Sequence, residues 1–342
     1  MAEGRKFKVA VVGATGAVGE VMLAILAERK FPVSEVVPLA SERSAGGTVK
    51  FGNRDLTVRN LDTYDFAGTD FGFFSAGSSV SKVHGPRAAA AGCVVVDNTS
   101  QFRYDADIPL VVSEVNPHQI PNRPRGIIAN PNCSTMQMLV ALAPIHRAVG
   151  IERINVATYQ SVSGAGRSGL EELGRQTAAM LNFKDPSPKK FPVQIAFNLI
   201  PHIDDFQDNG YTKEEMKVVW ETRKILEDES IQVNPTAVRV PVFFGHSEAV
   251  HIETREKISA ERVRELLSNA PGVVVVDERK PGGYPTPVTH AAGKDPVFVG
   301  RIREDISHPR GISLWVVADN IRKGAALNAI QIGELLAKER GG

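Results

Sequence analysis

The first part of the chain combines short apolar runs with one helical pattern. Phe7–Val12 is apolar apart from Lys8 and stops at Gly13, as expected for a strand buried on both faces of a parallel sheet. Residues 17–29 then carry apolar side chains at helical spacing, and a second strand is predicted at about Glu35–Ala40. This succession predicts a strand–turn–helix–strand unit at the start of the chain.

Further apolar runs extend the predicted sheet. They lie at Phe71–Phe74, Val94–Val96, Leu110–Val112 and Ile127–Ala129, and turn residues follow most of them. We therefore expect a mostly parallel, doubly wound α/β sheet over roughly the first 130 residues.

The pattern changes after Asn130-Pro131. A helix is predicted at Ser134–Val149, followed by strands near 153–162, 236–244, 247–254, 272–277, 297–304 and 312–318 and by helices near 168–181, 212–228 and 259–269. Many strands with fewer helices indicate an α+β domain on a mixed or antiparallel sheet. The polar, proline-rich segment 182–192 is expected to be an exposed loop, and a last amphipathic helix is expected at Arg322–Lys338.

Composition sets limits on the function. The chain has 342 residues, 42% of them hydrophobic, and a net charge of +1, which suits two domains and predicts neither a nucleic-acid nor a membrane partner. No apolar stretch approaches the roughly 20 residues of a membrane span, and the start of the sequence lacks the pattern of a signal peptide. With only two cysteines, we expect a cytoplasmic protein without disulfides.

A glycine-rich turn follows the first predicted strand. In Gly13-Ala14-Thr15-Gly16-Ala17-Val18-Gly19 the glycines are spaced three and three, and the turn opens an amphipathic helix. Glycines allow close backbone approach, and the helix start presents N–H groups to a pyrophosphate. We interpret the turn as a dinucleotide site; the alternative is a structural turn without a ligand.

The end of the second predicted strand bears on which dinucleotide binds. There the sequence reads Ser41-Glu42-Arg43-Ser44, and a guanidinium between hydroxyl groups suits the 2′-phosphate of NADP. Glu42 alone would favour NAD, whose ribose hydroxyl is usually held by a carboxylate. A solvated surface turn is the other alternative, and we favour NADP.

Cys133 is the candidate nucleophile. It lies in Asn130-Pro131-Asn132-Cys133-Ser134-Thr135, between a buried strand and a helix. The positive end of the helix favours the thiolate, and the same N–H groups could stabilise an oxyanion formed by its attack on a carbonyl. Cys93 follows an alanine run and begins a strand, so packing explains it better.

His246 is the candidate proton carrier. An apolar segment begins at Arg239 and ends in a Gly245 turn, which we expect to expose the histidine. On one extended strand, Arg239 and His246 would lie about 23 Å apart. The two residues can therefore serve one site only if the backbone bends after Pro241.

Seven segments, taken together and in order, resemble one enzyme family. They are GATGAVG, DNTSQFR, NPNCST, YQSVSGAG, YTKEEMK, RVPVFFGHSE and ADNIRKGAALNA. Over essentially its whole length, the chain is similar to aspartate-semialdehyde dehydrogenases of the bacterial type. The resemblance implies a Rossmann-like NADP-binding domain at 1–132 and 322–342, an α+β catalytic and dimerisation domain with a mixed sheet at 133–321, and a homodimer.

The resemblance also implies a reaction. The family reduces L-aspartyl-4-phosphate with NADPH to L-aspartate-4-semialdehyde and phosphate, in the synthesis of lysine (through diaminopimelate), methionine and threonine. Cys133 would be the nucleophile, His246 the acid/base group, and Gln160 would position the substrate or the thioester. Arg239 would bind the substrate α-carboxylate and Glu214 its α-ammonium group. Arg103, Lys217 and Asn132 would hold the phosphate.

The family motifs also imply which residues contact NADP. They are Gly13, Thr15, Gly16, Ala17, Val18, Ser41, Arg43, Ser44, Ser163, Gly164 and Asn320. We predict no metal site. Three alternatives stay open: N-acetyl-glutamyl-phosphate reductase, whose substrate has no ammonium for Glu214; glyceraldehyde-3-phosphate dehydrogenase, whose substrate has no α-carboxylate for Arg239; and a non-catalytic NADP-binding paralogue.

Overall fold

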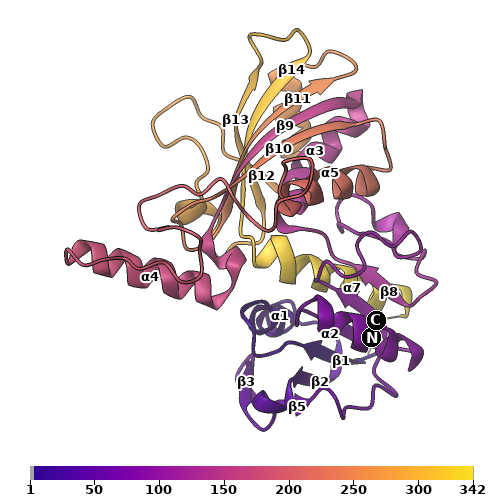
Figure 1. Ribbon diagram of the computed structural model, residues 1–342. Coiled ribbons are helices and arrows are strands. Elements are labelled where there is room, and N and C mark those ends of the chain that lie inside the picture. Colours follow the sequence, from indigo (N-terminus) through magenta and orange to yellow (C-terminus); the bar gives the residue numbers. More distant parts are fainter. Residues whose placement is uncertain (1–3, 342) are drawn as a thin grey trace. The chain divides into compact units, whose positions relative to one another are not determined.

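The computed structural model describes residues 4–341, and the chain forms two compact units (Figure 1). The first unit comprises the chain up to Pro131 and again from Ala325 onward. The second unit comprises Asn132–Gly324. Each unit has its own six-stranded sheet. Within residues 4–341, no helix is both long enough and apolar enough to cross a bilayer.

The sheet of the first unit is parallel throughout. Its strands lie in the order β5 (Arg59–Asn60), β2 (Val33–Ala40), β1 (Phe7–Val12), β6 (Phe71–Phe74), β7 (Val94–Asp97) and β8 (Ile127–Ala129). Because β2 and β6 flank β1 on opposite sides, the strand order reverses at β1. Sheets of this kind bind ligands beyond the carboxyl end of the strands at such a reversal, and here that end is Gly13.

Helices enclose this sheet. Apolar side chains of α1 (Ala17–Glu28) and α7 (Leu327–Glu339) share one core with β1 and β6. The predicted last helix begins as a π-helical turn, η5 (Arg322–Ala326), and belongs to the first unit from Ala325 onward. The doubly wound α/β architecture predicted from the apolar runs is confirmed.

The sequence pattern missed helix α2 (Ser78–Ala90). The helix contacts β6, β7 and β8, but it lacks apolar periodicity because its buried residues are the small Ser81, Gly85 and Ala88. Pro86 lies inside it. A helix that packs through small side chains gives no hydrophobic stripe for sequence analysis to detect.

The predicted strand at Leu110–Val112 was wrong. Only Leu110 forms a bridge, to Ala129. Side-chain amides replace the rest of the ladder: Asn116 accepts from Val112 N and donates to Leu110 O, both at 2.9 Å. The pattern also missed the hairpin of β3 (Thr48–Phe51) and β4 (Arg54–Thr57), although Val49 and Phe51 of β3 are buried.

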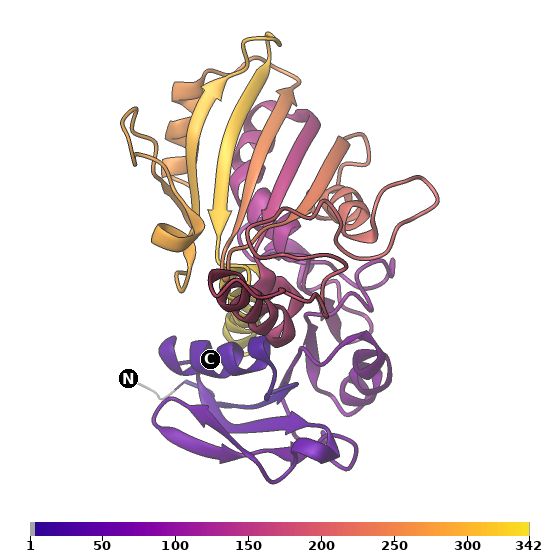
Figure 2. The same cartoon turned by 60° about the vertical axis from the view of Figure 1, so that its left-hand side comes forward.

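The second unit has a mixed sheet, as predicted, and Figure 2 shows its strands side by side. The order is β10 (Gln232–Arg239), β9 (Ile151–Gln160), β11 (His246–Thr254), β14 (Gly311–Ala318), β13 (Val297–Glu304) and β12 (Val273–Val275). The edge pairs β10–β9 and β12–β13 are parallel and the three inner pairs are antiparallel. Helices α3 (Cys133–Val149), α5 (Lys213–Leu226) and α6 (Ala260–Ser268) contact this sheet.

The strand predicted at 236–244 ends earlier than expected, at Arg239. The early end of this strand allows Arg239 and His246 to lie in one site. The strand β10 ends at Arg239, and the chain turns through Pro241 and Gly245 before β11 begins at His246. Arg239 is in register with Gln160 at the end of β9, and Ser247 with Tyr159. The bend required for Arg239 and His246 to share a site is therefore present.

The remaining segments are a helical arm and short turns. Helix α4 (Arg167–Leu181) leads into the segment 182–192, which is mostly exposed, as predicted. The Glu172 carboxylate ties this segment back by accepting from Lys189, Lys190 and Phe191 N–H groups. Short helical turns are η1 (Glu42–Ser44), η2 (Pro117–Gln119), η3 (Val162–Ala165) and η4 (Pro287–Ala291).

The close packing of α1 on the glycine turn yields a stability prediction. A Cβ at Gly19 would lie 2.1 Å from the Gly13 carbonyl oxygen, a backbone atom that cannot yield cheaply. We expect Gly19→Ala to lower the free energy of unfolding by about 1–3 kcal/mol, measured by denaturant titration. Gly174→Ala is the matched control, because nothing lies within 4 Å of that position in α4. Equal stability of the two variants would contradict the packing argument.

Candidate active site

Cys133 is the first residue of α3 and is half-buried. Asn132 caps the helix: its Oδ1 accepts from Ser134 N at 3.0 Å and from Thr135 N at 3.2 Å. Those two N–H groups therefore already have an acceptor. We expected the N–H groups at this helix start to be able to stabilise an oxyanion. For Ser134 N and Thr135 N this expectation is corrected, because the Asn132 cap already accepts their hydrogen bonds.

Two neighbours of Cys133 were missed by sequence analysis. A Cβ at Gly324 would lie 2.7 Å from the Cys133 Cβ, so only glycine allows this approach. The fully buried Glu221 accepts from Asn132 N at 2.6 Å and so fixes the residue before the thiol. Its one signal in the sequence is a spacing of seven from Glu214, which places both on one face of α5.

Glu214 lies at the centre of the polar cluster in the second unit. Its Oε1 accepts from Asn132 Nδ2 at 2.9 Å and from Gln160 Nε2 at 3.2 Å, and its Oε2 binds Lys217 Nζ at 2.9 Å. Burial by itself raises the pKa of Glu214, but Lys217 and the two amides outweigh it and bring the pKa to about 2. The carboxylate is therefore ionised although it is buried.

Lys217 binds a second carboxylate as well, that of Asp204, at 2.7 Å. Burial lowers the pKa of Lys217, but Glu214 and Asp204 together raise it. Glu214 and Lys217 are three residues apart on α5, so they share a helix face, and they form an ion pair. Asp204 lies in a loop without regular structure, and no pattern in the sequence pointed to it.

Arg239 is buried at the end of β10 and donates from Nη1 to Ser161 O at 2.8 Å. Burial lowers its pKa, while the charges of Glu214 and Cys133 act in the opposite direction. Its charge is thus coupled to both the carboxylate and the thiol. A Cβ at Gly164 would lie 2.9 Å from Arg239 Nη1, so this glycine, predicted from the family motif to contact the cofactor, makes room for the guanidinium.

His246 is completely buried, and the expectation of an exposed histidine was wrong. The Gly245 turn is covered: a Cβ there would meet Pro287 at 2.9 Å, and Gly245 N donates to Asn320 Oδ1 at 3.0 Å. The ring still reaches the site, because a Cβ at Gly164 would lie 3.4 Å from its Nε2.

The hydrogen bonds of His246 fix its tautomer. Its Nδ1 lies 3.1 Å from Ser161 N, and a backbone N–H can only donate, so Nδ1 accepts and the proton is on Nε2. No partner among residues 4–341 reaches that Nε2. Burial, and then the charge of Arg239, lower the pKa of His246 to about 3. At neutral pH the ring is therefore neutral, with its one proton on Nε2.

Asn320 joins three segments around this histidine. Its Oδ1 accepts from Ser161 Oγ at 3.0 Å, from Ser163 Oγ at 3.1 Å and from Gly245 N at 3.0 Å. Ser163 and Asn320 were both predicted as cofactor contacts. Within the second unit, they hold the turn after β9 against the turn before β11.

The glycine turn of the first unit is built as predicted. Gly13 N and Ala14 N donate to Leu39 O at 2.9 and 3.1 Å, which ties the turn to the end of β2. Gly13 has a φ of 86°, and a Cβ there would lie 2.5 Å from Ser75 O. Helix α1 then starts at Ala17 with Gly16 as its N-cap and no side-chain cap. Its first N–H groups are thus not taken up by a capping side chain.

The Ser41–Ser44 turn follows β2 directly. Ser41 and Arg43 are exposed and Ser44 is half-buried. No hydrogen bond or ion pair joins Arg43 to another residue of the described chain 4–341. Leu39, which accepts hydrogen bonds from the glycine turn, lies four residues before Arg43. An exposed guanidinium at this place, without a carboxylate partner among the described residues, is suited to binding an anionic group.

Two other predicted positions lie in the first unit. Arg103 is buried and donates to Thr99 O at 3.1 Å and Asn98 O at 3.0 Å, in the loop after β7. Cys93 is buried, and burial raises the pKa of its thiol to about 12. The interpretation of Cys93 as a packing residue is confirmed.

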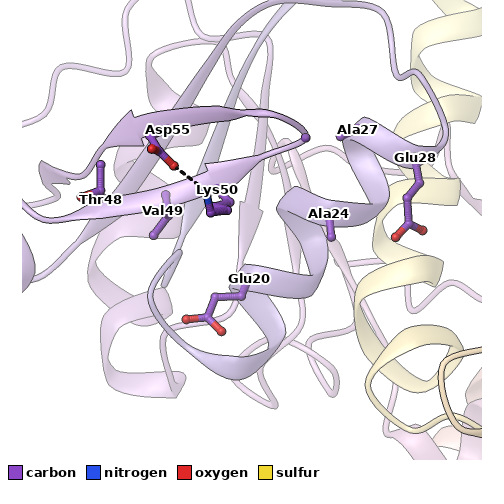
Figure 3. A pocket seen from close by; sticks show the side chains of 9 residues that line it. Glu20, Ala24, Ala27, Glu28, Thr48, Val49, Lys50 and Asp55 are labelled. Carbon is purple, nitrogen blue, oxygen red and sulfur yellow. Dashed lines mark hydrogen bonds and ion pairs between the residues drawn. The ribbon is translucent and has the colours of Figure 1, made fainter.

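A hollow of about 850 Å³ lies along α1 and the β3–β4 hairpin (Figure 3). Glu20 and Glu28 line it from the helix, and Lys50 and Asp55 from the hairpin, where they pair at 3.2 Å. None of the predicted site residues takes part. In the range 4–341, no cluster of three or more His, Cys, Asp or Glu side chains is arranged to hold a metal.

Comparisons with known proteins agree with this geometry. Residues 8–123 match the semialdehyde dehydrogenase NAD binding domain and residues 142–323 the semialdehyde dehydrogenase dimerisation domain. The aspartate-semialdehyde dehydrogenase of Legionella pneumophila is 60% identical over 98% of this chain and 97% of its own length. The chain belongs to the aspartate-semialdehyde dehydrogenase family. As a member of this family it is an oxidoreductase, and neither the other acyl-phosphate reductases nor a non-catalytic paralogue is favoured.

Solved structures of the family also match closely. Aspartate semialdehyde dehydrogenase II of Vibrio cholerae, complexed with ASA, is 59% identical with a TM-score of 0.96, covering 98% of this chain and 99% of that one. The Candida albicans enzyme with NADP is 27% identical with a TM-score of 0.75, covering 97% and 98%. The fold is therefore that of the family in both units.

The neutral His246 yields a pH prediction. In the unfolded chain a histidine binds a proton below pH about 6.5, whereas folded His246 does so only near pH 3. Unfolding therefore takes up a proton between these values, and stability falls as the pH is lowered through this window, by up to about 1.4 kcal/mol per pH unit.

We expect His246→Asn, which keeps an acceptor for Ser161 N, to lose this slope between pH 6.5 and 4.5. Above pH 7 the free energies of unfolding of the two proteins should run parallel. The measurement is denaturant titration at a series of pH values. Identical slopes in the acidic window would show that His246 is protonated in the folded protein.

Proposed function

We propose that this protein reduces L-aspartyl-4-phosphate with NADPH to L-aspartate-4-semialdehyde and phosphate, in the synthesis of lysine, diaminopimelate, methionine and threonine. One observation carries the proposal: a half-buried thiol at a helix start shares a polar site with an ionised Glu214, a buried Arg239 and a neutral His246. An amino-acid acyl group has a matching ammonium, carboxylate and reactive carbonyl.

Substrate selection would rest on the two buried charges. The Arg239 guanidinium would bind the α-carboxylate through two parallel hydrogen bonds. The Glu214 carboxylate, ionised with a pKa of about 2, would bind the α-ammonium group. An N-acetylated substrate offers no cation there and would leave this buried carboxylate without that partner, which supports an aspartyl over an N-acetyl-glutamyl substrate.

The covalent step would begin at Cys133. Its thiolate attacks the acyl carbon, the bond from carbon to the phosphate oxygen breaks, and phosphate leaves a thioester on the enzyme. The neutral His246 cannot hold the thiol proton at neutral pH. The start of α3 and the charge of Arg239, which is coupled to Cys133, would favour the thiolate instead.

His246 would act on the substrate oxygen. Its Nε2–H is a buried donor without a partner in the described chain, suited to hydrogen-bonding the oxygen on which negative charge develops, and to protonating it. The Gln160 amide, held by Glu214 at 3.2 Å, would orient the acyl group. By microscopic reversibility, Nε2 would take this proton back in the oxidative direction, while Nδ1 continues to accept from Ser161 N.

The cofactor site would combine the glycine turn and the Ser41–Ser44 turn. The α1 start without a side-chain cap, at Gly16, Ala17 and Val18, fits a pyrophosphate, and Gly13 and Thr15 shape the turn before it. Arg43, which has no partner among the residues that the structure describes, fits a 2′-phosphate together with Ser41 and Ser44. Bound NADPH supplies the hydride for reduction. Ser163, Gly164 and Asn320 would also contact NADP.

The remaining assignments concern phosphate, assembly and location. Arg103, Lys217 and Asn132 would hold the phosphate of the substrate, and Lys217 would then exchange part of its contact with Asp204 for the phosphate oxygens. A homodimer is supported by the match to a dimerisation domain at residues 142–323. We also propose the cytoplasm as the site of action, as expected for thiols that stay reduced.

The function is tested by phosphate-dependent reduction of NADP. We expect turnover with L-aspartate-4-semialdehyde and little with N-acetyl-glutamate semialdehyde or glyceraldehyde-3-phosphate. Cys133→Ala should lower kcat at least about a thousandfold without weakening NADP binding. The control Cys93→Ala should retain activity, because that thiol is buried in the core. Turnover by the Cys133→Ala variant would exclude the covalent route.

Cofactor choice is tested at Arg43. A lost charge-assisted hydrogen bond costs about 1.5–3 kcal/mol, so Arg43→Ala should raise the KM for NADP about 10- to 100-fold and change that for NAD little. Arg54→Ala, which removes an exposed guanidinium from β4, is the matched control and should change neither. Equal losses with both dinucleotides would refute the 2′-phosphate assignment.

A further inference from the structure

A second buried carboxyl group lies close to the site and has no role in the mechanism above. Glu248 is on β11, two residues after His246, and both side chains are completely buried. Residues two apart on a strand share a face. Among residues 4–341, no donor comes into hydrogen-bonding geometry with either Glu248 carboxyl oxygen. An ionised carboxylate in that position would be a buried charge without compensation.

Gln137 is a neighbour of this carboxyl group and also contacts His246. It lies one turn after Cys133 on α3 and is completely buried. Its Nε2 donates to the His246 carbonyl oxygen at 3.4 Å, while its Oε1 has no donor from the described residues. Its amide is close enough to influence the pKa of Glu248, which burial raises well above the ordinary value.

These unsatisfied atoms complement one another once Glu248 carries a proton. A carboxylic acid has one O–H donor and one carbonyl acceptor, and a primary amide has the reverse set. The acid O–H would then supply the donor that Gln137 Oε1 lacks. The Gln137 Nε2–H group continues to hold the His246 carbonyl oxygen.

We propose that Glu248 is a positioning residue that works as a neutral carboxylic acid, locking the Gln137 amide that anchors His246 to the helix bearing Cys133. The proposal deepens the proposed function, since its kinetic consequence depends on His246 acting in the reaction. It assigns to Glu248 a hydrogen-bonding role that glutamine can fill and that no apolar residue can.

The kinetic test compares two substitutions at this position. Glu248→Gln keeps one donor and one acceptor, so we expect at least about a third of the wild-type kcat. Glu248→Leu leaves the Gln137 carbonyl unsatisfied and frees the amide, so kcat should fall about 10- to 100-fold with a smaller change in KM. Equal losses in both variants would overturn the neutral-acid assignment.

A matched control separates positioning from simple core damage. Val250→Ala creates a cavity on the same face of β11 but removes no polar partner of Gln137, so it should lower the Tm and leave kcat nearly unchanged. If kcat falls as much in Val250→Ala as in Glu248→Leu, the positioning role is wrong. If Glu248→Leu fails to fold, the double variant Gln137→Leu/Glu248→Leu is used instead, because it replaces both polar partners together. We expect it to fold and to show the loss of kcat of about 10- to 100-fold that is expected for Glu248→Leu.

Protonation is tested independently of activity. The infrared spectrum of the protein at neutral pH should contain the carbonyl stretch of a protonated carboxylic acid, insensitive to bulk pH, that is absent in Glu248→Gln and present in Cys133→Ala. Absence of that band in wild type would overturn the proposal even if the protein is active. Its presence in a protein without the proposed activity would support the neutral acid and refute only the proposed function.

Discussion

The site depends on keeping one ionised carboxylate, that of Glu214, away from water. An uncompensated charge at this depth would cost several kcal/mol. Lys217, Asn132 and Gln160 compensate it together, and each comes from a different place: the same helix, the cap of α3 and the end of β9. The charge therefore ties α5, α3 and the sheet together. Cys133 is positioned as a consequence, since the Asn132 that binds Glu214 also caps the helix that begins with the thiol.

The contrast with Glu248 shows that donors, and not depth, decide the state of a buried carboxyl group. Both side chains are buried. Glu214 receives an ammonium and two amides, so its pKa falls to about 2, whereas Glu248 is near one amide and its pKa rises. His246 is kept neutral first by its own burial and then by the positive charge of Arg239. Charged recognition groups and neutral hydrogen-bonding groups can thus stand side by side in one site.

Sequence analysis succeeded where a pattern records burial directly. The βαβ start and the mixed second sheet were readable because apolar runs and their periods report which faces are covered. The analysis failed where small or polar side chains do the packing, as in α2 through Ser81 and Gly85 and at Leu110, where Asn116 replaces the ladder. The motifs located Cys133 and Arg239, but Asp204 and Gly324 act through contacts between distant segments, and no local spacing encodes these.

Helices α1 and α3 begin with different N-cap residues, Gly16 and Asn132. The N-cap residue determines whether the first N–H groups of each helix are available to bind an anion. Gly16 offers α1 no side-chain acceptor, so the first N–H groups stay suited to an external anion. Asn132 gives α3 an internal acceptor for the N–H groups of Ser134 and Thr135. The positive electrostatic potential of this helix terminus therefore acts on Cys133, while the two capped N–H groups do not bind an anion that would compete with the substrate. An exchange of the two caps would therefore impair both functions by opposite routes, because one terminus would lose its ligand site and the other would gain a competing one.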